Sequence, residues 1–182
     1  MSRALIRGLA PAWALLGVAG LFTSAVVRLG SRGLATVGEG LSPVQWVALV
    51  LFTLVMVYGE GVLALQRKWV PRLLGRARSL RHEPLGLKIL GPLYGLSLVG
   101  GTRKELLRGW LGTLAIITAI VIVRSMPEPW RGIVDFAVAS ALAWGLLSIA
   151  LGSPRVFRST EAEPSAESVS GAGHTRGEAH AP

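Results

Sequence analysis

The stretch Leu41–Leu65, "LSPVQWVALVLFTLVMVYGEGVLAL", is the longest apolar segment of the chain and decides its fold class. It carries no charge over the 19 residues from Leu41 to Gly59, close to the ~20 apolar residues that a helix needs to cross a bilayer core. Glu60 interrupts it between two glycines. Because a charged carboxylate near the bilayer centre costs about 2.5–3.5 kcal/mol on insertion scales, Glu60 must be paired, protonated or hydrated.

Three further stretches are long enough to cross a membrane once the charged residues at their ends snorkel to the headgroups. Only 16% of the 182 residues are charged, whereas soluble domains average about 25%. The sequence therefore predicts an all-α integral membrane protein with a compact bundle of four transmembrane helices. The expected spans are about residues 11–29, 43–66, 105–124 and 130–151.

A fifth apolar segment, residues 87–102, contains "LGPLYGLSLVGG" (Leu90–Gly101) and is broken by Pro92. Its uncharged part is 14 residues long, which is typical of a re-entrant or interfacial segment and short for a span. With four spans, 14 Lys and Arg residues lie on one side of the membrane and 4, namely Arg28, Arg32, Arg124 and Arg131, lie on the other. With five spans the division is 11 and 7, and Arg176 in the tail is left out of both counts. Since short cytoplasmic loops are enriched in Lys and Arg, we expect four spans with both termini in the cytoplasm.

The two ends of the chain differ in character. Residues 1–152 form the expected membrane domain, and residues 153–182 are predicted to be a disordered cytoplasmic tail, because small and polar residues bury too little apolar surface to offset their ordering entropy. The first residues, with two arginines before an apolar stretch, also resemble a cleaved signal peptide. The apolar stretch continues through Val26 and Val27, which favours an uncleaved anchor.

Residues 67–84 form a basic segment in which Leu73, Ala77 and Leu80 share one side of a helix expected to start near Pro71. This pattern is typical of an amphipathic helix in the membrane interface. Its basic side chains either set the topology or contact anionic lipid headgroups at the cytoplasmic face. The candidate headgroup contacts are Arg67, Lys68, Arg72, Arg76, Arg78 and Arg81.

Glu60, Gln66 and Arg108 are the candidate intramembrane polar site. One interpretation is a structural Glu60–Arg108 pair that holds two helices together. The other is a proton-titrating or ligand-binding Glu60 in a cavity covered by residues 89–102, since intramembrane acids are frequently functional. Arg131 and Asp135, four residues apart in the fourth span, are predicted to form a local ion pair.

Several classes of function are disfavoured by composition. The chain has no cysteine and three histidines, two of them in the tail, so no metal site or cofactor is expected. No Walker loop, nucleophile elbow or zinc-protease motif is present, and we expect no enzymatic activity. The net charge of +9 comes from basic residues that flank apolar stretches, which argues against nucleic acid as a partner.

Two patches, "YGEGVLALQRKWVPR" (Tyr58–Arg72) and "PEPWRGIVDFAVASALAWG" (Pro127–Gly145), resemble a family of small, functionally unassigned bacterial multi-pass inner-membrane proteins. The resemblance implies a location in the bacterial inner membrane and no particular activity. It rests on Glu60, Gly61, Gln66, Pro71, Arg72, Pro129, Trp130, Arg131, Gly132, Asp135, Trp144 and Gly145.

The function expected from these features is that of a non-enzymatic structural, assembly or lipid-associated accessory protein. Its cytoplasmic face, Arg67–Arg108, would contact anionic lipid, a second copy of the chain or another membrane protein. The alternative is a small carrier or proton-coupled permease subunit that uses Glu60.

Overall fold

The computed structural model of the chain describes residues 3–154 and 156. Throughout this part the regular structure is helical. The helices are α1 (Arg3–Gly38), α2 (Pro43–Met56), the π-helix η1 (Val57–Trp69), α3 (Val70–Ser79), α4 (Leu85–Ile89), α5 (Gly91–Gly95), α6 (Arg103–Arg124) and α7 (Trp130–Gly152).

Four helical segments are long and apolar enough to cross a membrane: Leu9–Gly38, Pro43–Ser79, Arg103–Arg124 and Trp130–Gly152. The second is the continuous run of α2, η1 and α3. This result confirms the predicted all-α fold with four candidate transmembrane helices. The predicted re-entrant or interfacial segment 87–102 contains the end of α4 and all of α5, each five residues long, followed by turns. None of the candidate spans lies in this segment.

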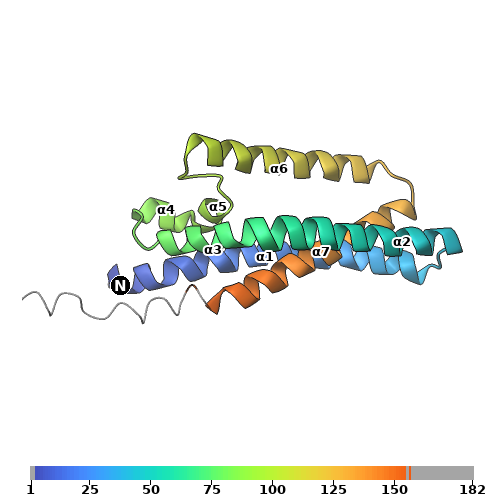
Figure 1. Cartoon of the computed structure of the whole chain (residues 1–182), viewed down its shortest axis with the longest axis horizontal. Coiled ribbons are helices and arrows are strands. Elements are labelled where there is room, and N and C mark those ends of the chain that lie inside the picture. Colours follow the sequence, from blue (N-terminus) through green and yellow to red (C-terminus); the bar gives the residue numbers. More distant parts are fainter. Residues whose placement is uncertain (1–2, 155, 157–182) are drawn as a thin grey trace, which may run out of the picture.

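The long helices run up and down, so that their connections gather at two ends (Figure 1). We call one the basic end: it contains the start of α1, residues 70–105 and the end of α7. The other, the hairpin end, contains the loops 39–42 and 125–129. The basic end therefore gathers the described termini and the segment between α3 and α6.

Two helix starts are encoded locally by capping boxes. The Ser42 N–H donates to Gln45 Oε1 at 2.9 Å, and the Gln45 N–H donates to Ser42 Oγ at 3.4 Å. At the start of α6, the Thr102 N–H donates to Glu105 Oε2 at 3.0 Å, and the reciprocal bond to the Thr102 side chain is also formed. Because each box provides acceptors for two backbone N–H groups that would otherwise be unpaired, these residues fix where α2 and α6 begin.

The stretch that carries Glu60 is wound as a π-helix over 13 residues. At its end the Val70 N–H donates to the carbonyl of Leu65, five residues earlier, and Pro71, which has no N–H to donate, opens α3. Most π-helical segments are single wide turns that occur at functional positions. The 13-residue π-helix is therefore far longer than the single π-turns usual inside α-helices.

Helix α7 occupies the centre of the packing, with α1 on one side and α2 and η1 on another. Close approach depends on glycines: a Cβ on Gly33 of α1 would lie 2.6 Å from the Phe136 Cβ of α7. Likewise, a Cβ on Gly145 of α7 would lie 2.7 Å from Leu65 Cδ1 of η1. Small residues thus bring these backbones together, as is common between membrane helices.

The most fully buried side chains lie at the basic end. One apolar cluster joins α1, α3 and α7 through Leu15, Val18, Val70, Leu73, Ala77, Ile149 and Val156, and a second joins Ala10, Ala14, Leu80 and Tyr94. Beside the first cluster the rings of Phe22 and Trp69 stack, with centroids 5.2 Å apart. Apolar packing therefore fixes this end of the bundle.

Helix α6 lies apart from the other three long helices (Figure 1). None of its residues is buried, and its start rests on the turn after α5, where a Cβ on Gly109 would lie 2.6 Å from the carbonyl oxygen of Ser97. Leu107, Trp110, Leu114 and Ile117 are more than half exposed. The sequence predicted a compact bundle of four helices, and the structure packs three of them closely while leaving α6 on the outside.

Some boundaries differ from the prediction. The first span was expected to end near residue 29, but α1 continues to Gly38 because Gly33 and its neighbours pack against α7. The basic segment 67–84 is not separate, since it continues η1 as a helix as far as Ser79. Apart from Ser153, Pro154 and Val156, the tail predicted for residues 153–182 lies outside the described residues.

Candidate functional site

Arg76 of α3 is the centre of a polar cluster at the basic end. Its Nε donates to the carbonyl oxygen of Tyr94 at 2.7 Å, and its Nη2 donates to those of Val99 at 3.0 Å and Gly100 at 3.4 Å. Nη1 contacts Glu105 Oε2 at 3.3 Å. All three nitrogens of one guanidinium are therefore used to hold α5, the turns after it and the start of α6 against α3.

Tyr94 provides the second part of this cluster. Its ring lies under the Arg76 guanidinium, 4.2 Å from the guanidinium carbon to the ring centroid. Its hydroxyl lies 3.1 Å from Ser79 Oγ and donates to Glu83 Oε1 at 3.3 Å. Tyr94 is buried, so its phenol joins the apolar packing of the basic end to a polar network.

The predicted headgroup contacts are divided by the structure into two groups. The Arg76 side chain is 13% exposed and engaged with the chain, and Arg81 Nη2 donates to the carbonyl of Val156 at 3.0 Å. These two arginines are positioned for a structural role, since each donates to backbone oxygens, although Arg81 Nε is buried without a partner within the described part of the chain. Arg67, Lys68, Arg72 and Arg78 are exposed.

The structure does not bring the predicted intramembrane polar residues together. Gln66 accepts a hydrogen bond from Trp144 Nε1 at 2.8 Å, which joins η1 to α7. Glu60 and Arg108 are both exposed, and among the described residues neither forms a hydrogen bond or ion pair. The proposed Glu60–Arg108 pair is therefore absent here, because Glu60 projects from η1 beside the face that contacts α7, whereas α6 stands apart.

Asp135 is buried in α7, and its Oδ2 has no hydrogen-bond partner within the described part of the chain. The predicted Arg131–Asp135 ion pair does not form at contact distance there. Arg131 and Arg32 are the opposite charges that act on this carboxylate. The absence of the predicted Arg131–Asp135 ion pair is explained by packing, since α7 contacts α1 closely at the neighbouring residues Gly132 and Phe136.

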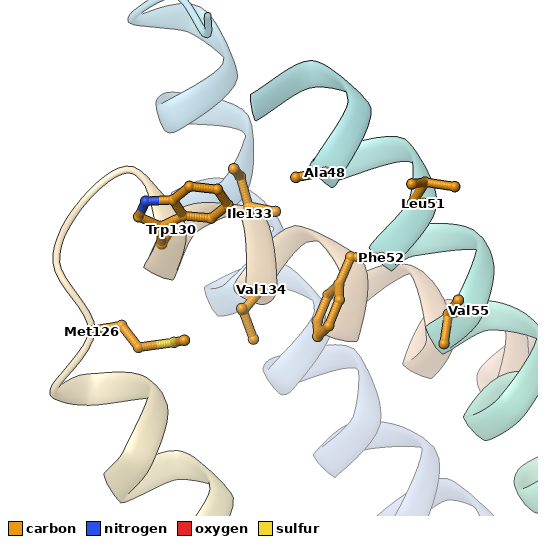
Figure 2. A pocket seen from close by; sticks show the side chains of 8 residues that line it. All are labelled: Ala48, Leu51, Phe52, Val55, Met126, Trp130, Ile133 and Val134. Carbon is orange, nitrogen blue, oxygen red and sulfur yellow. The ribbon is translucent and has the colours of Figure 1, made fainter. Parts of the chain in front are cut away.

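An apolar hollow of about 360 Å³ lies toward the hairpin end, between α2 and the start of α7. Figure 2 shows Trp130, Ile133 and Val134 on one side of it, Phe52 and its helical neighbours on the other, and Met126 from the loop after α6. No charged side chain lines it. A lipid chain or an apolar helix is the kind of occupant that such a lining accepts.

Sequence reasoning missed the polar partners that build the cluster at the basic end. Glu105 could have been found, because Thr102 and Glu105 have the spacing of a capping box before an apolar run. Tyr94 stands out as the one aromatic residue in a glycine-rich segment. Its position under Arg76 depends on the chain reversal around α4 and α5, for which the sequence carries no comparable signal.

Comparison with known proteins adds nothing to this picture, because no protein-family model, curated protein or solved structure matches the chain. Functional inference therefore rests on the geometry of the chain itself.

Proposed function

We propose that this chain is a non-enzymatic, lipid-associated accessory protein of a bacterial inner membrane, with its basic end in the cytoplasm. The proposal is carried by the exposed basic face that Arg67, Lys68 and Arg72 form where the apolar part of the second long helix ends. Anionic lipid attracts each such side chain near the surface by about 1 kcal/mol. Three of them would favour anionic over zwitterionic headgroups about a hundredfold.

The rigidity of this end supports the same proposal. Arg76 ties α3 to the turns before α6, and Arg81 ties it to the end of α7. Exposed basic side chains on a fixed helix lose less freedom on binding a headgroup than side chains on a loop. The cluster at the basic end would thus present a preorganised surface to the lipid.

The alternative prediction, a carrier that uses Glu60, has less support. A transported ion or substrate needs the carboxylate to face a polar cavity, as intramembrane acids in transporters do. Glu60 is exposed on the outside of η1. Neither the hollow in Figure 2 nor a second, shallower one of about 330 Å³ on α2 is lined by it.

The proposal can be tested by measuring lipid retention. Protein purified in mild detergent is titrated with short-chain phosphatidylglycerol or phosphatidylcholine, and bound lipid is counted by native mass spectrometry. We expect the wild type to retain phosphatidylglycerol preferentially and Arg72→Gln to lower its affinity about fivefold, in line with the loss of about 1 kcal/mol. Arg124→Gln at the hairpin end is the matched control and should leave the preference unchanged. Equal retention of the two lipids by the wild type would refute the proposal.

A further inference from the structure

Glu60 lies near the middle of the membrane domain. The next residue, Gly61, packs against α7, where an added Cβ would be 3.3 Å from the Trp144 Cβ and 3.4 Å from the Ala141 carbonyl oxygen. Helix α7 runs from Trp130 to Gly152, so residue 141 is about 16 Å from either end at the helical rise. Glu60 is therefore level with the middle of α7, far from both of its ends.

Arg28 of α1 lies at the same level. Two residues after it, Gly30 faces α7, and a Cβ there would be 3.8 Å from the Ala139 Cβ. Because α1 and α7 run in opposite directions, Arg28 is level with the residues just after Ala139. An acidic residue on η1 and a basic residue on α1 therefore share one depth.

Neither charge is satisfied within the described part of the chain. Glu60 and Arg28 are both exposed, and neither side chain takes part in a hydrogen bond or ion pair there. Both α1 and η1 pack on α7, and this packing leaves the two charged side chains exposed. Acyl chains at mid-depth offer no hydrogen-bonding partner to either charge, and intramembrane charges are normally paired.

We propose that a second copy of the chain covers these surfaces, with Glu60 of one copy paired to Arg28 of the next. Rotation about an axis along the membrane normal, the symmetry of a closed membrane oligomer, keeps every residue at its own depth. Two charges at one depth can therefore meet between copies, and each copy supplies both halves of the pair. This charge complementarity selects a second copy over an unrelated protein.

The surroundings of both residues leave room for such an approach. A Cβ added to Gly59, beside Glu60, would meet no atom within 4 Å. On α1, Ser24 is a small exposed residue one turn before Arg28. Small residues next to the charges allow two helices to come close enough for a direct ion pair. This inference is independent of the proposed lipid association at the basic end.

Cysteine cross-linking tests the pairing directly, because the chain contains no cysteine. Full-length Glu60→Cys and Arg28→Cys variants with tags of different size are co-expressed, and membranes are oxidised with copper phenanthroline. We expect a mixed dimer that carries both tags. The matched control is Leu21→Cys, which is also exposed on α1 but lies seven residues, or about 10 Å, from the depth of Arg28. No mixed dimer with Arg28→Cys, or equal cross-linking with Leu21→Cys, would overturn the proposal.

Charge exchange gives a second test that does not depend on disulfide geometry. We expect Glu60→Gln to weaken self-association in vesicles about tenfold, the effect of losing one strong polar contact between membrane helices. The double variant Glu60→Arg with Arg28→Glu should restore it, whereas either change alone should not. Self-association is measured by single-molecule photobleaching over a range of protein-to-lipid ratios. A Glu60→Gln variant that associates like the wild type would refute the pair.

Discussion

Replacement of Arg76 by methionine should release the segment between α5 and α6 from α3. Methionine keeps much of the apolar stem but cannot donate a hydrogen bond. The two shorter bonds lost, to the carbonyl oxygens of Tyr94 at 2.7 Å and Val99 at 3.0 Å, are charge-assisted and contribute about 1.5 kcal/mol each. The contact with Glu105 adds little, because that carboxylate is 49% exposed and such pairs contribute about 0–1 kcal/mol.

The local free energy of opening should therefore fall by about 3 kcal/mol, which corresponds to roughly hundredfold faster amide exchange. Hydrogen–deuterium exchange of the protein in detergent measures this opening at the amides of Leu96, Ser97 and Leu98, which donate to carbonyl oxygens of α5. Arg72→Met is the control, since Arg72 is an exposed arginine one turn earlier on the same helix.

Arg76→Lys should give an intermediate rate, because one ammonium group cannot reproduce the three directions of the guanidinium. Exchange at these amides that stays within twofold of the wild type in Arg76→Met would refute the assigned role of Arg76. An equal increase in Arg72→Met would refute it as well, because the effect would then follow from lost charge alone.

Two further substitutions test the packing around α7. Gly33→Ala should lower the free energy of unfolding of the detergent-solubilised protein by about 1–3 kcal/mol, since the added Cβ would lie 2.6 Å from Phe136. Gly38→Ala is the control, because the space around Gly38 is open. Equal melting temperatures of the two variants by circular dichroism would contradict the contact between Gly33 and Phe136. Trp144→Phe should cost about 1 kcal/mol through the lost hydrogen bond to Gln66, and a Gln66→Leu variant should show no additional loss when the two are combined. Additive losses in this double-mutant cycle would show that the two side chains do not act together.

The long helices could be predicted from the sequence because they depend on local properties, namely the length of each apolar run and the turn residues between the runs. The apolar length of Leu41–Gly59 and the two prolines of the loop before Trp130 specify a helix and a turn without knowledge of the fold. The same holds for the expectation of four spans, since the uncharged run around Pro92 is short for a fifth.

The packing of these helices could not be predicted in the same way. In a lipid solvent an apolar residue is equally suited to face a lipid chain or another helix, so hydropathy did not distinguish exposed α6 from central α7. Arg76 and Arg72 look alike in the sequence, and only the return of Tyr94 and Val99 to α3 separates their roles. Arg28 was expected near the exterior end of the first span, at about residue 29, although α1 continues to Gly38.

The segment between α3 and α6 is expected to stay on one side of the membrane. Single cysteines at His82 and Lys104, both exposed, can be tested with a membrane-impermeant thiol reagent in sealed vesicles of known orientation, with Ser125→Cys as the hairpin-end reference. The structure predicts that His82→Cys and Lys104→Cys react from one side of the membrane and Ser125→Cys from the other. Reaction of His82→Cys and Lys104→Cys from opposite sides would show that residues 87–102 cross the bilayer, and would contradict the arrangement of four spans.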